Sequence, residues 1–322
     1  MKIVFIGTGY VGLVSGTCFS EFGFDVTCVD LQESKIEDLN QGIMPIYEPG
    51  LEELVLRNKQ KSRLHFTTDL LTTVSEADVV FIAVGTPTRE SDGHADLKYV
   101  DAAARQIGKA LQGYTVVVTK STVPVGMGRR VGEIIRDANP DADFSVASNP
   151  EFLREGSAIE DFMKPDRVVV GTEEKRAQTV MESLYEPLSK SGVPVLYTDL
   201  ETSELTKYAA NAFLATKLVF INEIADLCEA CGADVKKVGE GMGLDSRIGS
   251  KFLLPGPGYG GSCFPKDTLA LVRTGETYNT NMSVVENVAQ SNENRKKLMA
   301  QRIINSVGED VNGKTIAVLG VT

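Results

Sequence analysis

The fold is decided by residues 2–30, "KIVFIGTGYVGLVSGTCFSEFGFDVTCVD". An apolar run typical of a buried strand leads into a G-x-G-x-x-G pattern, a helical run follows, and a second strand-like run closes on Asp30. Gly7 allows a tight turn, Gly9 lets a pyrophosphate approach the backbone, and Gly12 lets the helix pack on the strand. Because the helix N-terminus then faces the phosphates, the stretch predicts a dinucleotide-binding unit.

The acid that closes the second strand selects the cofactor. Asp30 is expected to accept hydrogen bonds from ribose hydroxyls, and a carboxylate there disfavours the 2′-phosphate of NADP, so the sequence predicts NAD. Lys35 is within reach of the same ribose or of a phosphate. The alternative is a glycine-rich turn in a sheet that binds another nucleotide. The cofactor-binding residues expected here are Gly7, Gly9, Tyr10, Val11, Gly12, Asp30 and Lys35.

Short β-rich runs alternate with helical stretches over the first 200 residues or so. Several of these runs are continuously apolar, which is typical of strands that helices bury on both faces. The alternation predicts an α/β fold with a Rossmann-like, doubly wound parallel sheet. The expected strands are 2–7, 25–30, 64–69, 78–84, 115–122, 144–150, 167–171 and 193–199.

The pattern changes to helices beyond residue 200. Residues 202–231 contain no proline or glycine and stop before Gly232, which predicts one long helix that crosses between domains or builds an interface. A glycine-rich loop is expected over 239–262, with further helices at about 265–275 and 283–307.

Three domains follow from this pattern. We expect an NAD-binding domain over 1–200 and an all-helical central domain, also used for dimerisation, over 201–300. Residues 312–322, "NGKTIAVLGVT", look like a fresh first strand, so 301–322 are expected to begin a C-terminal α/β domain that is truncated in this chain.

Composition narrows the class of partners and the location. The net charge is −11 and there is no basic tract, so nucleic acid is not expected as a partner. The apolar runs are too short to cross a bilayer, and Met1 is followed directly by a strand-like run, so we expect a cytoplasmic protein without membrane contact. Both histidines, His65 and His94, lack an obvious partner, so a catalytic base is not expected to be histidine.

The five cysteines are expected to be free thiols, because their number is odd and no export signal is seen. Cys228 and Cys231 form a C-x-x-C pair that suits either a redox or metal site or two small residues on a helix. No second pair or nearby histidine completes a zinc site, so the sequence predicts no metal.

Two polar motifs come where predicted strands end, "VGTPT" (84–88) and "KSTVPVG" (120–126). The carboxyl edge of an α/β sheet is where ligands bind, so Thr86, Ser121 and Thr122 are expected to contact cofactor or water. The alternative is ordinary turn chemistry.

Two pairs of polar side chains occur at a spacing of four residues. In "NPEFLREGSA" (149–158), Glu151 and Glu155 would share one face if the segment were helical, and two close carboxylates suit proton transfer. Lys207 and Asn211 on the predicted long helix would form an oxyanion clamp. The alternatives are a solvated helix start and a surface lysine with a polar neighbour.

The stretch "GPGYGGSCFPKD" (256–267) places Cys263 after four glycines and at an expected helix start. The partial positive charge of a helix N-terminus and the Lys266 ammonium would both stabilise a thiolate. The alternative is a small buried residue in a tight loop.

Taken in order along the whole chain, these motifs resemble those of the UDP-glucose/GDP-mannose dehydrogenase family of nucleotide-sugar 6-dehydrogenases. The resemblance implies two NAD per turnover and oxidation of C6 without release of the aldehyde, with UDP-glucose as substrate and UDP-glucuronate as product. Alternatives are a GDP-mannose or UDP-N-acetylmannosamine 6-dehydrogenase and a non-catalytic NAD-binding dimer. Because the third domain of the family binds much of the UDP group, this chain alone is expected to bind NAD weakly and to turn over little substrate.

The resemblance also implies roles for residues. Cys263 is the expected nucleophile, Lys207 and Asn211 stabilise oxyanions, and Asp267 orders water or the lysine. Thr122, Glu151 and Glu155 hold water or move protons, with Glu151 the expected base for hydrolysis.

Further contacts are implied in the same way, including an Arg247 that reaches the partner's active site in a homodimer built on the long helix. The further cofactor contacts are Thr86, Ser121, Thr122, Glu155 and Lys266. The substrate contacts are Glu151, Phe152, Leu153, Arg154, Glu155, Lys207, Asn211, Arg247, Phe252, Leu253, Leu254, Pro255, Gly256 and Gly260.

Overall fold

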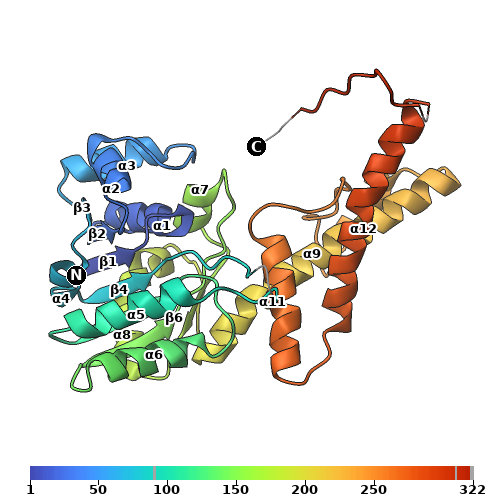
Figure 1. Ribbon diagram of the computed structural model, residues 1–322. Coiled ribbons are helices and arrows are strands. Elements are labelled where there is room, and N and C mark those ends of the chain that lie inside the picture. Colours follow the sequence, from blue (N-terminus) through green and yellow to red (C-terminus); the bar gives the residue numbers. More distant parts are fainter. Residues whose placement is uncertain (90–91, 309, 320–322) are drawn as a thin grey trace. The chain divides into compact units, whose positions relative to one another are not determined.

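The computed structural model describes residues 1–89, 92–308 and 310–319. The chain divides into two compact units, Met1–Tyr208 and Ala209–Thr322. The first unit holds a sheet covered by helices, and the second is built from helices and a long irregular segment (Figure 1).

The sheet of the first unit contains all eight strands that the sequence predicts, in the order β3-β2-β1-β4-β5-β6-β7-β8. The chain order reverses beside β1, which pairs with β2 on one side and β4 on the other. Such a reversal is where doubly wound sheets bind ligands. The strands are β1 (Lys2–Ile6), β2 (Asp25–Val29), β3 (Leu64–Thr67), β4 (Val79–Ile82), β5 (Thr115–Thr119), β6 (Phe144–Ser148), β7 (Val168–Gly171) and β8 (Val195–Thr198).

The predicted doubly wound parallel sheet is confirmed, with one exception in strand direction. β6 and β7 pair antiparallel through Ser148 and Gly171, whereas every other strand pair of the sheet is parallel. After β6 the chain makes only the short helix α7 (Ala158–Met163) before β7 begins. It re-enters the sheet from the carboxyl edge that it left, so the residues between the two strands stay at that edge.

Side chains alternate between the two faces of the sheet. In β1, Ile3 and Phe5 point into one apolar cluster, and Val4 and Ile6 into the other. Figure 1 shows α1 and α7 together on one face and α5 and α6 together on the opposite face. The first face is covered by α1 (Tyr10–Glu21), α2 (Glu33–Gln41), α3 (Leu51–Gln60), α7 and α8 (Lys175–Lys190). The second is covered by α4 (Leu70–Ser75), α5 (Lys98–Ala110) and α6 (Met127–Ala138).

The long helix predicted over 202–231 is confirmed as α9 (Leu200–Cys231), which begins in the first unit and continues in the second. It is followed by α10 (Val235–Gly243), α11 (Phe264–Thr277) and α12 (Ser283–Ser306).

The expected loop over 239–262 is wrong in its first residues, because α10 runs to Gly243. The Asp234 side chain accepts hydrogen bonds from the backbone of Lys236 and Lys237 and so caps this helix. Gly239 is needed for packing, because a Cβ there would stand 2.8 Å from the carbonyl oxygen of Leu253.

The C-terminal segment is described only in part. α12 ends at Ser306, and residues 310–319 form neither helix nor strand, while residues 320–322 lie outside the described part. A strand needs a partner that exchanges hydrogen bonds with it. The start of a further domain over 301–322, and the domain boundaries at 200 and 300, therefore stay predictions.

None of the helices in the described part of the chain is both long and apolar enough to span a membrane.

Candidate active site

The glycine fingerprint forms a tight turn between β1 and α1. Gly7 has a φ of +102°, a left-handed conformation that favours glycine. A Cβ on Gly12 would stand 1.9 Å from the carbonyl oxygen of Gly7, so only glycine lets α1 pack this closely. A Cβ on Gly9 would meet nothing within 4 Å, because the backbone there faces open space. Packing therefore explains two of the three glycines, and an approaching ligand explains the third.

Asp30 lies beside this turn, as the sequence predicts. Its carboxylate accepts hydrogen bonds from the backbone and hydroxyl of Thr8, at 3.0 and 2.7 Å, and from the backbone of Gln32. The Lys35 ammonium lies 3.0 Å away. Partial burial raises the pKa of Asp30, but these hydrogen bonds outweigh it and lower the pKa to about 2. A carboxylate so firmly ionised suits ribose hydroxyls and repels a 2′-phosphate.

Tyr10, the first residue of α1, is held by an acid that sequence reasoning missed. Its hydroxyl donates to the buried Glu48 carboxylate at 2.6 Å, and burial followed by this contact raises the pKa of Tyr10. Glu48 also accepts hydrogen bonds from the backbone of Gly156 and Ala158, both at 2.8 Å. It thus connects the fingerprint to the start of α7.

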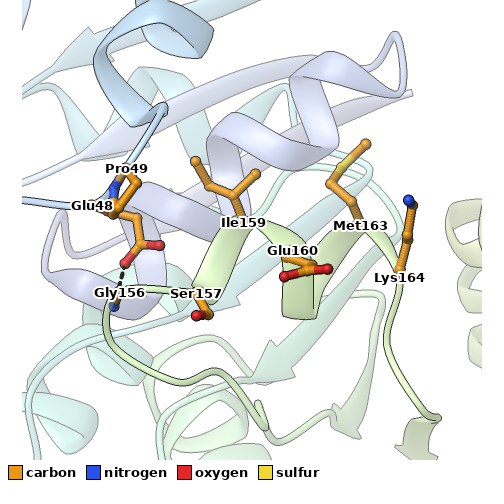
Figure 2. Close-up of a pocket in the computed structure, with 8 residues that line it drawn as sticks. All are labelled: Glu48, Pro49, Gly156, Ser157, Ile159, Glu160, Met163 and Lys164. Atoms are coloured by element: carbon orange, nitrogen blue, oxygen red, sulfur yellow. Dashed lines mark hydrogen bonds between the residues drawn. The ribbon is translucent and has the colours of Figure 1, made fainter.

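Figure 2 shows the surface hollow beside Glu48, with the Glu48–Gly156 hydrogen bond on one wall. Its volume is about 390 Å³. It is lined by Glu48, Pro49, Gly156, Ser157, Ile159, Glu160, Met163 and Lys164.

The two polar motifs that follow β4 and β5 are joined to one another. The Thr86 hydroxyl donates to the carbonyl oxygen of Thr122 at 2.9 Å, and the Ser121 hydroxyl donates to Val84 at 2.7 Å. Thr86 and Ser121 are buried, and Thr122 is half-buried. The predicted ligand residues therefore lie together at the carboxyl edge of the sheet.

Glu204 ties the second of these motifs to α9. Its carboxylate accepts hydrogen bonds from the backbone of Gly126 and Gly128, at 2.6 and 2.7 Å, where α6 begins. No cation pairs with it in the described part of the chain, and it is 2% exposed. Burial raises the pKa of Glu204 to about 7, against the effect of the backbone donors. Sequence reasoning missed this residue.

Glu204→Gln is expected to flatten the pH dependence of stability. Between pH 4.5 and about 7 the folded protein holds a proton on Glu204 that the unfolded chain releases, so the wild type loses stability as pH rises through this window. The loss is on the order of 3 kcal/mol in the free energy of unfolding, from the size of the pKa shift. Urea unfolding at several pH values measures it.

The matched control is Glu37→Gln, on an exposed position of α2. It should retain the wild-type slope of stability against pH. An equal slope in wild type and Glu204→Gln would contradict the expectation.

Glu151 and Lys207 form a buried ion pair in the first unit, 3.0 Å between Oε1 and Nζ. The second carboxylate oxygen of Glu151 accepts the backbone N–H of Leu153 at 2.5 Å. The Arg167 guanidinium lies over the ring of Phe152, with Cζ 3.6 Å from the ring centroid. The Lys207 ammonium lies 5.3 Å from the same centroid. Two predicted catalytic residues are therefore in contact.

The helix that would place Glu151 and Glu155 on one face does not form. Residues 151–154 are irregular, and Glu155 begins a turn that precedes α7. Proline at position 150 and glycine at 156 do not favour a helix there. As a result Glu151 is buried and Glu155 is exposed, and the two carboxylates have different surroundings.

The remaining predicted residues of this segment also differ from one another. Leu153 packs on the apolar core of the first unit, as does Val11 of the fingerprint. Arg154 is exposed and pairs with Asp161 at 2.6 Å.

In the second unit, Cys263 lies where the sequence predicts, as the residue that precedes α11. It is half-buried. The backbone N–H of Asp267 donates to the carbonyl oxygen of Cys263 at 2.8 Å, and the Asp267 carboxylate is buried. That carboxylate accepts a hydrogen bond from the Asn211 amide at 2.6 Å and pairs with Lys266 at 2.6 Å. The first turn of α11 thus joins the backbone of Cys263 to Asp267, whose carboxylate holds the Asn211 amide.

The glycine-rich segment before Cys263 is held by side chains from α9 and α12. The Asn222 side chain accepts a hydrogen bond from the backbone N–H of Gly256 at 2.8 Å. Arg295 donates to the carbonyl oxygen of Gly256 at 2.7 Å. Asn292 contacts both backbone groups of Tyr259. These three anchors were missed, because nothing near them in sequence marks them.

The predicted sugar-contacting residues have unequal exposure. Leu253 is buried, Phe252 and Pro255 are half-buried, and Leu254 and Gly260 are exposed. Phe252 adopts a positive φ of +64° and packs edge-on against Phe264. Positive φ is uncommon for a bulky residue and often marks a functional turn.

Arg247 is 87% exposed at its side chain and pairs only locally with Asp245, at 2.6 Å, within the described residues. Cys228 and Cys231 both lie on α9, as expected for small residues on a helix. No group of three potential metal ligands occurs within the ranges 1–89, 92–308 and 310–319.

Comparison with known proteins identifies the family. Residues 1–189 match the NAD-binding domain of the UDP-glucose/GDP-mannose dehydrogenase family, and residues 201–294 match its central domain. The chain belongs to the UDP-glucose/GDP-mannose dehydrogenase family. It is therefore an NAD-binding dehydrogenase.

Individual members of the family show how close the relation is. The chain is 60% identical to the UDP-glucose 6-dehydrogenase of Rhizobium meliloti (strain 1021), over 100% of this chain and 74% of that protein. A UDP-glucose dehydrogenase from Pyrobaculum islandicum superposes with a TM-score of 0.92 at 42% identity, covering 95% of this chain and 71% of that one. A GDP-mannose dehydrogenase from Pseudomonas aeruginosa superposes with a TM-score of 0.74 at 35% identity, covering 96% and 71%.

The residues of the first unit fit NAD. The open backbone at Gly9 leaves room for the pyrophosphate, and the ionised Asp30 carboxylate suits the ribose hydroxyls. Both lie at the point where the strand order of the sheet reverses.

Proposed function

We propose that this protein oxidises C6 of UDP-glucose twice and releases UDP-glucuronate. The reaction consumes one water and two NAD, and it yields two NADH and three protons. The observation that carries the proposal is Cys263, a half-buried thiol at the start of α11, in whose first turn the Asp267 carboxylate holds the Asn211 amide. The high identity to UDP-glucose 6-dehydrogenases over the whole chain supports UDP-glucose over GDP-mannose or UDP-N-acetylmannosamine.

A covalent bond to the Cys263 thiol would keep the aldehyde intermediate on the enzyme between the two oxidations. Bound NAD supplies the chemistry of hydride acceptance. After the first oxidation the Cys263 sulfur bonds to C6 of the aldehyde, and the carbonyl oxygen takes the negative charge. The second oxidation turns this thiohemiacetal into a thioester. Water then bonds to C6 as the C–S bond breaks, so the cysteine regains its thiol.

The other residues act on charge and protons. Lys207 and Asn211, on α9, would stabilise the oxyanions on C6. Asp267 holds the Asn211 amide and the Lys266 ammonium in place. Glu151 would take a proton from the attacking water, and its hydrogen bonds to Lys207 and to the backbone of Leu153 fix its orientation. Thr122 would hold water beside the cofactor.

A panel of nucleotide sugars tests the choice of substrate. The full-length protein is incubated with NAD and UDP-glucose, GDP-mannose or UDP-N-acetylmannosamine, and NADH is followed by absorbance. We expect kcat/KM for UDP-glucose to exceed the others by about 100-fold or more, because pocket groups left unpaired by a wrong ligand are costly. Faster turnover of either other sugar would contradict the assignment. Low activity of the 322-residue chain alone stays a prediction.

We also propose a homodimer through α9. Phe213, Phe220 and Leu227 are large apolar residues of this helix, and they are 66%, 46% and 61% exposed. A spacing of seven residues places them on one face of the helix, which is the pattern of helices that pair. In such a dimer the exposed Arg247 is the residue proposed to reach the partner's active site. A cytoplasmic location stays a prediction.

Phe220→Lys is expected to convert a dimer into a monomer, because a charge at the centre of the apolar stripe must be buried to keep the contact. Light scattering coupled to size-exclusion chromatography measures the mass. Leu71→Lys, an exposed apolar position of α4, is the matched control and should stay dimeric. A monomeric wild type, or a dimeric Phe220→Lys, would contradict the proposal.

A further inference from the structure

Lys120 is a buried ammonium to which the reaction outlined above assigns no role. It follows β5 and is 3% exposed. Its Nζ donates to Oδ1 of Asn149 at 3.0 Å and lies 3.4 Å from the Asn149 carbonyl oxygen. The rings of Phe81 and Phe162 flank it, with centroids 5.8 and 5.9 Å away. Within the described residues it forms no ion pair with a carboxylate.

Asn149 is fixed from several strands at once. Its backbone N–H donates to Thr119 at 2.9 Å, and its side-chain amide donates to the Val169 carbonyl oxygen at 2.8 Å. The Tyr185 hydroxyl of α8 donates to the same Oδ1 that accepts from Lys120, at 2.5 Å. Asn149 is separated from Glu151 only by a proline, so this network sets where the Glu151 backbone leaves the sheet.

The charges around Lys120 are few and buried. Glu151 and Lys207 are 7% and 3% exposed and act on it electrostatically. Burial lowers the pKa of Lys120 to about 8, Glu151 opposes this shift, and Lys207 adds to it. Tyr185, which faces it from α8, has its pKa raised by burial and is neutral. The interior of the first unit therefore brings two lysines and one glutamate together in this cluster.

This arrangement is costly for stability alone. A methionine would fill the space between two aromatic rings without the desolvation of an ammonium, and replacing buried charges by apolar groups is often neutral or stabilising. The Asn149 amide would still have Tyr185 and Val169 as partners. The use of a lysine here points to its charge.

We propose that Lys120 is a positioning residue for Glu151. It fixes the backbone before Glu151 through Asn149, and its positive charge, added to that of Lys207, keeps Glu151 a carboxylate inside the domain. The inference rests on the proposed function, in which Glu151 is the base that hydrolyses the thioester. Without the charge of Lys120, Glu151 would take up a proton more readily. As the pH is lowered, thioester hydrolysis would then slow at a higher pH than in the wild type.

The test measures the lifetime of the covalent intermediate against pH. The full-length protein is mixed with UDP-glucose and NAD, quenched in acid at intervals, and the mass of the Cys263-linked thioester is followed by mass spectrometry from pH 5 to 8. In Lys120→Met, the pH below which thioester decay slows is expected to rise by about one unit, from the loss of one buried charge. Lys120→Arg keeps the charge and should keep the wild-type profile.

Two further variants make the result decisive. Asn149→Asp places a negative charge beside the ammonium and should move the profile in the same direction as Lys120→Met, so it serves if Lys120→Met does not fold. Lys109→Met, an exposed lysine of α5, is the control and should leave the profile unchanged. A wild-type profile in a folded Lys120→Met or Asn149→Asp would overturn the inference.

Failure of the proposed function is visible separately. If wild-type protein forms no thioester on Cys263, the proposed reaction is wrong whatever the variants do.

A measurement of stability without substrate tests whether Lys120 is a buried charge. Because the pKa of Lys120 is lowered in the fold, the wild type gains stability as pH rises from about 8 towards 10.5. Lys120→Met should lack this gain, and an equal gain in both would contradict the burial of a charged lysine.

Discussion

Cys263→Ser is expected to reduce steady-state NADH production from UDP-glucose by about 1,000-fold or more. A serine hydroxyl is far less ionised than a thiol at neutral pH, so it attacks the aldehyde poorly, and an ester is a less reactive acyl intermediate than a thioester. Absorbance of NADH, with the aldehyde trapped and quantified, measures both oxidations. Turnover unchanged from wild type would contradict the role of the thiol.

Two observations on the same protein guard against a trivial loss of activity. The circular dichroism spectrum of Cys263→Ser should equal that of wild type, because the residue precedes α11 and is only half-buried. Cys231→Ser, at an exposed cysteine at the end of α9, is the matched control and should retain turnover.

Gly12→Ala is expected to destabilise the first unit strongly and to abolish NAD binding. Its Cβ would stand 1.9 Å from the Gly7 carbonyl oxygen and 3.2 Å from Cβ of Ala83, so α1 must move away from β1. Overpacking at a site of backbone contact lowers the free energy of unfolding by about 3 kcal/mol or more. Urea unfolding and calorimetric titration with NAD measure the two effects.

Gly9→Ala is the matched control for the glycine fingerprint. It lies two residues from Gly7 but has a negative φ, and its Cβ would meet nothing within 4 Å. The free energy of unfolding should change by less than about 0.5 kcal/mol, as at exposed positions. NAD affinity alone should fall, because the methyl group occupies the space of the pyrophosphate. Normal stability in Gly12→Ala would contradict the packing argument.

The strands of the sheet were predictable because the features that define each strand lie within a few consecutive residues. Strands that helices cover on both faces are rich in apolar and β-branched residues, and each of the eight predicted β-rich runs became a strand. The fingerprint was predictable for the same reason, since its glycines are required by contacts a few residues apart. The long helix followed from the absence of proline and glycine up to Gly232.

The partners of buried charged groups were not predictable. Glu48 contacts Gly156, Glu204 contacts Gly126, and Lys120 contacts Asn149, and each pair is far apart in sequence. Nothing near one member indicates the other, because the sheet topology alone brings them together. The antiparallel pairing of β6 with β7 was missed likewise, since a β-rich run carries no signal for its direction.

The number of NADH formed per UDP-glucose distinguishes a twofold oxidation at C6 from a single one. A limiting, weighed amount of UDP-glucose is consumed to completion by the full-length protein with excess NAD, and NADH and UDP-glucuronate are quantified in the same sample. We expect two NADH and one UDP-glucuronate for each UDP-glucose, with no free aldehyde. One NADH per sugar, with the aldehyde released, would contradict it.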